Sequence, residues 1–308
     1  MTASADARHA PAPLPDLRAI GLLVILCASW GLQQVAIKLA LVDFPSLTQM
    51  AIRYAGALIL VLLWAFARGV PLFRRDGSLL PGLLSGLFFG VEFALVYLAL
   101  DHTTASRVSL FLYTAPFFVA LGAIVVLPNE RLRPLQWLGM GFSFMGVMLA
   151  LGVPSSSASA SSLIADASCV LAGALWACQT LTVRKSVLRT LPFEKVLIYQ
   201  LAVATVIAGV MALVRGETVS WPVSTHAVLW VGYQMIWVVA VTYMVWFSLL
   251  ARYAAGPLQA GTSMTPVFGI AAGVLVLGEP LTPGFSVAAA LVFAGLVLVN
   301  YRPRARRS

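Results

Sequence analysis

Apolar runs of membrane-spanning length follow one another along almost the whole of this 308-residue chain. A helix needs about 20 predominantly apolar residues to cross about 30 Å of hydrocarbon. Lipid cannot hydrogen-bond to the backbone, so runs of this length cross as helices. Ten runs qualify: 19–40, 46–67, 79–100, 106–127, 134–152, 165–188, 194–214, 227–251, 257–277 and 283–301. The sequence therefore predicts an all-α integral membrane protein with ten transmembrane helices.

Composition identifies lipid as the solvent for most of the chain. Apolar residues make up 60% of it and charged residues only 10%, whereas soluble domains carry about 25% charged residues. The net charge is +9, but the charges lie in short gaps between apolar runs and not on one polar face. This pattern excludes a nucleic-acid partner. The three cysteines, Cys27, Cys169 and Cys178, lie in apolar runs and predict no disulfide framework.

The basic residues predict how the chain is oriented. An even number of spans leaves both termini on one side of the membrane. If that side is the cytoplasm, 16 of the 20 Lys and Arg residues lie on cytoplasmic segments, and the exceptions are Lys38, Arg53, Arg107 and Arg215. Cytoplasmic loops carry an excess of Lys and Arg in multi-pass proteins. We therefore expect a protein of the cell (inner or plasma) membrane with both termini in the cytoplasm.

The two halves of the chain repeat one another. Matching positions at offsets of 146 to 150 residues are Trp30 and Trp176, Gln33 and Gln179, Pro45 and Pro192, Pro116 and Pro266, and Glu130 and Glu279. Each half holds five predicted helices, and an odd number requires the second half to enter the membrane inverted. Inverted repeats characterise transporters, because two alike halves can open the protein to either side. An ancient duplication without mechanistic meaning is the alternative.

The repeat and the polar segments divide the chain into five parts. They are a disordered cytoplasmic tail (1–18), a first five-helix repeat (19–152), a linker (153–164), a second five-helix repeat (165–301) and a basic cytoplasmic tail (302–308). The linker is the longest polar stretch and contains the serine-rich run PSSSASASS.

Several stretches resemble the drug/metabolite transporter superfamily, EamA type. They are WGLQQVAIKLAL (30–41), ASRVSLFLYTAPFFVAL (105–121), NERLRPLQWLGMGFSFMGVML (129–149) and TPVFGIAAGVLVLGEPLTP (265–283). The resemblance implies a ten-helix fold of two inverted repeats that exports amino acids or other metabolites. The segment Pro128-Asn129-Glu130 departs from it, because the family usually has Gly before this Glu. Within the superfamily, an aromatic-lined middle resembles the aromatic amino-acid exporters of the YddG type.

Polar and aromatic residues near the middle of the predicted spans form the candidate substrate site. Amides both donate and accept hydrogen bonds, which suits a polar or zwitterionic substrate, although they also join helices to one another. Tryptophan anchors normally lie at the membrane surface, so Trp30 and Trp176 point to a cavity wall, with ordinary packing as the alternative. The candidates are Trp30, Gln33, Gln34, Glu92, Tyr97, Tyr113, Trp176, Gln179, Trp237, Tyr243 and Trp246.

Two charges fall inside predicted spans, where charges are costly and informative. Arg53 and Glu92 lie at similar depths on consecutive helices, and we expect a structural ion pair between them. Glu92 could also face the substrate or carry a proton, and Arg53 could instead extend toward the membrane surface. Pro116 and Pro266 lie in the middle of matching helices, where proline kinks a helix, and they are candidate hinges.

The leading functional hypothesis is a secondary transporter that exports aromatic or other neutral amino acids and related metabolites by alternating access. A multidrug or other metabolite carrier is the alternative. A membrane-embedded lipid enzyme is disfavoured, because His9, His102 and His226 all lie away from the middle of the membrane. The sequence shows no phosphate-binding Gly-Lys loop, and no cofactor or metal is expected. A channel is disfavoured by the repeat and by the lack of a selectivity-filter motif. Substrate, direction, coupling and oligomeric state stay open.

Overall fold

The computed structural model describes residues 13–126, 133–152 and 160–300. Within them the fold is helical throughout and contains no strand, which confirms the predicted all-α class. Nine of the described helices are long and apolar enough to cross a membrane, and a tenth apolar helix, Pro283–Val299, is shorter. Much of the predicted tails, the segment Pro128–Glu130 and residues 153–159 of the predicted linker lie outside the described residues.

The first half contributes five spans, of which the fourth is broken. The third, α3, begins after a loop that contains Asp76, and the fourth consists of two short helices separated by Tyr113 and Thr114. The bounds are α1 (Leu17–Ala40), α2 (Ser46–Ala67), α3 (Leu79–Leu100), α4 (Ala105–Leu112), α5 (Ala115–Val126) and α6 (Pro134–Gly152).

Among the described residues, the second half contributes four candidate spans and one shorter apolar helix, and two of these spans are irregular. One contains a π-helical stretch, η3, and another is broken by a 3₁₀ turn, η4, in a place that corresponds to the break in the first half. The bounds are α7 (Ala160–Lys185), η2 (Val187–Thr190), α8 (Phe193–Val214), α9 (Thr225–Gly232), η3 (Tyr233–Val241), α10 (Thr242–Arg252), α11 (Ala255–Gly261), η4 (Thr262–Met264), α12 (Thr265–Leu277) and α13 (Pro283–Asn300).

The start of α7 differs from the sequence-based boundary. The helix begins at Ala160, whereas the sequence indicated a linker up to residue 164. Hydropathy marks where lipid can cover a helix, not where the helix starts. Alanine is the best helix former, and a polar serine is tolerated in the first turn, so the helix extends into the polar segment.

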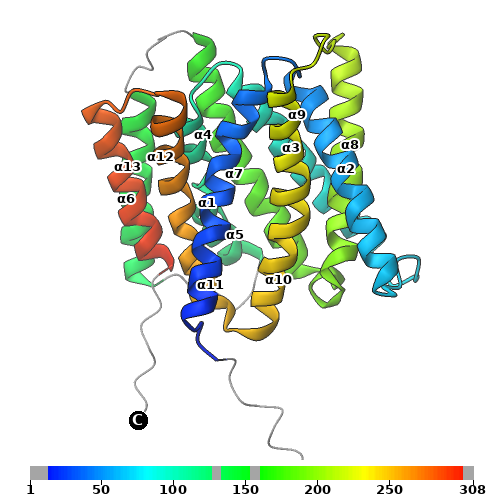
Figure 1. Cartoon of the computed structure of the whole chain (residues 1–308). Helices are drawn as coiled ribbons and strands as arrows, with labels where there is room; N and C mark the ends of the chain where they lie inside the picture. Colours follow the sequence, from blue (N-terminus) through cyan, green and yellow to red (C-terminus); the bar gives the residue numbers. More distant parts are fainter. Residues whose placement is uncertain (1–12, 127–132, 153–159, 301–308) are drawn as a thin grey trace, which may run out of the picture.

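Both described ends of the chain lie at the same end of the helical bundle (Figure 1). We call this the terminal end and the opposite one the distal end. The loops that follow α1, α3, α8 and α12 are at the distal end (Figure 1). The loop between α2 and α3 is at the terminal end.

Helices from the two halves pack against one another and form one body. The pairs are α1 with α12, α2 with α8, α3 with α7 and α8, and α6 with α13. Glycines allow α3 to approach α8 closely, since a Cβ on Gly86 would lie 2.8 Å from the backbone oxygen of Tyr199 and one on Gly90 would lie 2.7 Å from Ile207. Small residues permit this kind of contact between membrane helices.

Candidate functional site

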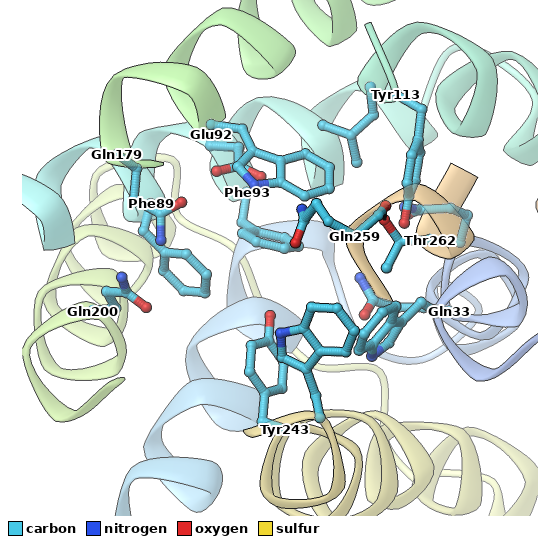
Figure 2. A pocket seen from close by; sticks show the side chains of 15 residues that line it. Gln33, Phe89, Glu92, Phe93, Tyr113, Gln179, Gln200, Tyr243, Gln259 and Thr262 are labelled. Carbon is cyan, nitrogen blue, oxygen red and sulfur yellow. Dashed lines mark hydrogen bonds between the residues drawn. The ribbon is translucent and has the colours of Figure 1, made fainter. Parts of the chain in front are cut away.

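A cavity of about 210 Å³ lies in the middle of the bundle, where helices of both halves meet (Figure 2). Its wall combines seven aromatic side chains, five amides, one carboxyl, one hydroxyl and one aliphatic side chain. The lining residues are Trp30, Gln33, Gln34, Phe89, Glu92, Phe93, Leu112, Tyr113, Trp176, Gln179, Gln200, Tyr243, Trp246, Gln259 and Thr262.

The two broken helices supply residues at the cavity from opposite halves. Tyr113 occupies the break between α4 and α5, and Thr262 begins the turn between α11 and α12. Pro116 and Pro266, the predicted hinges, each lie second in the helix that resumes after the break. A proline is tolerated in the first turn of a helix, because its missing N–H would have no partner there. The prolines therefore start new helices where the sequence indicated a kink.

Aromatic contacts hold the walls on two sides of the cavity. Trp30 donates its indole N–H to Thr242 Oγ1 at 2.8 Å and meets Trp246 edge to face at 5.7 Å. Tyr113 meets Trp176 edge to face at 5.4 Å. Such pairs add about 0.5–1.5 kcal/mol beyond the area they bury. The matched tryptophans Trp30 and Trp176 thus both contact another aromatic ring at the cavity. The two partner rings do not occupy matching positions, because one comes from α10 and the other from the break between α4 and α5.

A buried polar network lies behind one wall. Arg53 is 1% exposed and donates from Nη2 to Gln33 Oε1 at 3.0 Å and from Nη1 to the Tyr97 hydroxyl oxygen at 3.1 Å. Tyr97 in turn donates to Gln234 Oε1 at 2.7 Å. The network joins α1, α2, α3 and η3. It also fixes the side chain of Gln33, the one member of the network that reaches the cavity.

Glu92 is the carboxyl of the cavity wall. It is 2% exposed, and its Oε2 has no hydrogen-bond partner among the described residues. None of the fifteen described lining residues is Lys, Arg or His. Elsewhere in the described part of the chain, no group of three or more His, Cys, Asp and Glu side chains gathers as metal ligands do.

Nine of the eleven predicted substrate-site residues line the cavity, and two do not. Tyr97 lies behind the wall in the network of Arg53. Trp237 lies in the π-helical stretch η3, is 41% exposed and donates its indole N–H to Ser29 Oγ at 2.9 Å. The lining members are Trp30, Gln33, Gln34, Glu92, Tyr113, Trp176, Gln179, Tyr243 and Trp246.

The predicted ion pair between Arg53 and Glu92 is not formed. Among the described residues, Arg53 uses its terminal nitrogens for Gln33 and Tyr97, and no ion pair joins it to Glu92. Tyr97 lies five residues farther along α3 than Glu92, or about 7.5 Å nearer the distal end. The guanidinium is thereby drawn toward the tyrosine, and the carboxyl is left at the cavity.

Six lining residues are absent from the predicted site: Phe89, Phe93, Leu112, Gln200, Gln259 and Thr262. A Phe or Leu in a membrane helix gives no signal that separates a cavity wall from a lipid contact. Gln200 and Gln259 could have been found, because an amide within an apolar run is the same signal that identified Gln33. Thr262 could have been included as a hydroxyl close to Pro266.

The distal end is closed by carboxylates that accept several hydrogen bonds each. Glu279 accepts from the backbone N–H of Ala105 at 2.7 Å and of Ser106 at 2.9 Å, and from the Ser106 hydroxyl at 2.6 Å. It thus caps the start of α4, a helix of the other half, and not the helix that follows it in the chain. The preceding Gly278 has a φ of +65°, which glycine adopts without strain, and this turn directs Glu279 toward α4.

Two further carboxylates act in the same way at the distal end. Glu217 accepts from the backbone N–H of Thr48 at 2.8 Å and from its hydroxyl at 2.9 Å, which caps α2 from the second half. Asp43 accepts from the backbone N–H of Ser224 at 2.9 Å and from its hydroxyl. These hydrogen bonds from Ser224 lower the pKa of Asp43. The contacts tie the loops of the two halves together.

A buried ion pair completes the closure of the distal end. Asp166 of α7 accepts from Arg107 Nε at 2.8 Å and from Nη2 at 2.6 Å, and the Thr103 hydroxyl donates to its other oxygen at 2.6 Å. Arg107 Nη2 also donates to the backbone oxygen of Ala150 at 2.8 Å. The pair links α4 to α6 and α7. The sequence analysis left Arg107 without a role and did not identify Asp166.

The cavity reaches closer to the terminal end than to the distal end. On the distal side it stops along α1 at Gln34, six residues or about 9 Å before Ala40, where α1 ends. On the terminal side it includes Gln259, an exposed residue four positions or about 6 Å from Ala255, where α11 begins. The distal end is therefore closed above the cavity, while the terminal side is the shorter way out.

Comparisons with known proteins agree with this architecture. A model of the EamA-like transporter family matches residues 17–152 and again residues 163–301. A curated relative from Archaeoglobus fulgidus, described as an uncharacterized transporter, is 26% identical over 251 residues, which cover 80% of this chain and 85% of the relative. A protein of known crystal structure has the same fold, with a TM-score of 0.65 over 92% of this chain and 96% of that chain at 19% identity.

Proposed function

Given that the chain belongs to the EamA-like transporter family, we propose that this multi-pass membrane protein exports neutral amino acids, aromatic ones among them, and related small metabolites. The proposed mechanism is alternating access in a secondary transporter. The observation that carries it is the central cavity, whose aromatic and amide wall is built from both halves of the chain.

The size and chemistry of the cavity support a small, polar and partly apolar substrate. Its volume of about 210 Å³ lies below the ~300–1,000 Å³ of sites that enclose drug-sized ligands. Amides can bind both the donors and the acceptors of a zwitterion, and aromatic faces can cover an apolar side chain. A multidrug carrier, the alternative within the family, would need a larger chamber than this one.

The positions of the breaks support alternating access. α4 and α5 in the first half and α11 and α12 in the second half are interrupted at the level of the cavity. Transporters built from inverted repeats place discontinuous helices at the substrate site and rock one part against another around it. We propose the same arrangement here, with ten spans in two inverted halves and with hinges next to Pro116 and Pro266.

The position of the cavity along the bundle supports the proposed direction of transport. With both termini in the cytoplasm, as the charge distribution predicts, the terminal end faces the cytoplasm. The cavity then lies closer to the cytoplasm, and the carboxylate contacts of the distal end close the route to the outside. This arrangement suits loading of an export substrate from the cell interior.

The test is counterflow with the purified full-length protein in proteoliposomes. Vesicles loaded with unlabelled amino acids are assayed for uptake of radiolabelled phenylalanine, methionine and threonine. Saturable exchange that depends on the trapped amino acid is expected. Lack of exchange with every amino acid, in protein that is monodisperse and thermally stable, would contradict the amino-acid proposal.

A further inference from the structure

Glu92 is a buried carboxyl on the cavity wall whose hydrogen-bonding capacity the protein does not use. Its side chain is 2% exposed, and Oε2 has no partner among the described residues. The guanidinium of Arg53 donates to Gln33 and Tyr97, and no ion pair joins it to Glu92 among the described residues. At the distal end, by contrast, Glu217 and Glu279 each accept two or more hydrogen bonds.

A carboxylate in this position calls for a positive group from outside the protein. An ionised carboxylate that is buried without a partner is unfavourable, and it is relieved either by taking up a proton or by pairing with a hydrogen-bonded cation. The same cavity exposes the rings of Trp30, Tyr243 and Trp246. Aromatic faces attract ammonium groups, and recognition of ammonium ligands by aromatic cages rests on this interaction. The carboxylate and the rings are thus both suited to bind a protonated amine.

The second polar group considered in the cavity wall is the amide of Gln33, which a hydrogen bond from Arg53 holds in place. Arg53 Nη2 donates to Gln33 Oε1, which leaves the two N–H groups of the Gln33 amide as its remaining hydrogen-bonding capacity. The guanidinium is permanently charged and lies behind this amide. This wall of the cavity is therefore suited to an acceptor with negative charge, such as a carboxylate.

We propose that Glu92 binds the ammonium group of the transported molecule and that Gln33, positioned by Arg53, binds its carboxylate. The inference rests on the proposed transport function and narrows its substrate class to molecules that carry a free amine. The amine is essential because Glu92 is the one carboxyl among the described lining residues. The carboxylate raises affinity but is less essential, because Gln33 is neutral.

Binding, measured apart from flux, tests the proposal directly. Trp30, Trp176 and Trp246 line the cavity, so a ligand there should change the intrinsic fluorescence of the detergent-purified chain. The probes are phenylalanine, methionine and threonine, each beside its N-acetyl derivative and its decarboxylated amine. Wild-type protein is expected to bind at least one amino acid and its amine, and to bind the N-acetyl derivative at least about tenfold more weakly, as for loss of one charge-assisted hydrogen bond.

Substitutions test separately whether Glu92 binds the amine and whether Gln33 binds the carboxylate. Glu92→Gln is nearly isosteric and should remove the preference for the free amine, while Glu92→Asp should keep most of it. Gln33→Glu keeps an acceptor for Arg53 but removes the N–H donors, so the amino acid should bind about tenfold more weakly and the decarboxylated amine no more weakly. Glu194→Gln, the same substitution in the first turn of α8 and outside the cavity, is the matched control and should leave every affinity unchanged.

Each outcome has a defined meaning. Wild-type protein that binds the N-acetyl derivatives as well as the free amines, or a Glu92→Gln variant that keeps the preference, overturns the assignment of Glu92. A Gln33→Glu variant that weakens amine and amino acid equally overturns the assignment of Gln33. Counterflow separates these results from the proposed function: amino-acid exchange without amine selectivity defeats the inference alone, and selective amine binding without exchange defeats the transport of amino acids alone.

Discussion

The distal end and the central cavity treat the same chemical group in opposite ways. At the distal end, Glu279, Glu217 and Asp166 are each surrounded by donors from other helices. In the cavity, Glu92 is 2% exposed and keeps one oxygen without a partner among the described residues. Buried polar groups in folded proteins are normally satisfied, so an unsatisfied one asks for an explanation. The difference separates carboxylates that hold the fold from one that is available to a ligand.

The comparison also separates two kinds of cross-helix contact. The distal carboxylates join residues more than 50 positions apart and connect the two halves through donors on helix ends. The cavity wall is built instead from amides and from rings that meet edge to face, such as Trp30 with Trp246 and Tyr113 with Trp176. A transporter needs both kinds, because one end must close firmly while the middle exchanges partners with each substrate.

The largest effect is expected at the ion pair of Asp166 and Arg107. Asp166→Leu leaves a buried guanidinium without its carboxylate, and breaking such a pair costs about 3–5 kcal/mol. A large decrease in the thermal midpoint of the detergent-purified protein is expected. The double variant Asp166→Leu with Arg107→Met should recover much of the loss. If Asp166→Leu were as stable as the wild type, Asp166 would not be one of the carboxylates that stabilise the fold.

A smaller loss is expected when the cap of α4 is removed. Glu279→Ala deprives three donors of their acceptor, and loss of a helix cap costs about 0.5–2 kcal/mol. Because this contact closes the distal end, a cysteine introduced at Ser109 should also react faster with a membrane-impermeant thiol reagent from that side. Labelling at the wild-type rate in the variant would show that Glu279 does not control access.

Substitutions in the wall of the cavity should change transport kinetics and leave thermal stability largely unchanged. Trp176→Ala removes one partner of the ring pair with Tyr113, and the KM for the exchanged amino acid should rise about tenfold, which corresponds to about 1.4 kcal/mol. The matched control is Trp137→Ala, an exposed tryptophan of α6 outside the cavity. Equal kinetics in the two variants would argue against the cavity as the substrate site.

The smallest effect is expected at Asp76, which provides a partnered carboxylate at the terminal end for comparison. Lys195 donates to it at 2.8 Å, and this hydrogen bond holds its pKa at about 2. A lowered pKa means that the contact stabilises the fold above the unfolded-state pKa of about 3.9 and is lost as the pH falls through about 2. Asp76→Asn should therefore lower the thermal midpoint slightly at pH 7, and the difference from wild type should shrink below pH 4. A constant difference would assign the effect to something other than this charge.

The helices could be predicted from the sequence because lipid imposes one requirement along the whole span. α2 and α3 coincide with the predicted runs 46–67 and 79–100, and most other boundaries lie within a few residues. The matched positions of Trp30, Gln33 and Pro116 in the two halves also indicated which spans meet at a site. Apolar length and repetition are local properties of a sequence and can be read without knowing what packs against what.

The partners of individual polar groups could not be predicted in this way. The depth of Arg53 and Glu92 suggested that they pair, but depth does not tell which way a side chain points around its helix. The repeat marked Glu279 only as the match of Glu130, and in the structure it caps a helix start 173 and 174 residues away in the chain. Contacts at such separations depend on the packing of whole helices, which no local pattern encodes.

The cap that Glu279 places on α4 has a consequence for the balance between the two states of a carrier. In the proposed alternating-access cycle the distal end would open, and the carboxylate and the helix start that it covered would then both contact water. Water can hydrogen-bond to each of them, so the net loss is close to the modest worth of an exchanged hydrogen bond, about 0.5–1.5 kcal/mol. Exposing an apolar contact of the same area to water would cost more free energy. Hydration of the separated groups therefore keeps the free-energy difference between the open and closed forms small. The binding of one small molecule can then shift the equilibrium between them.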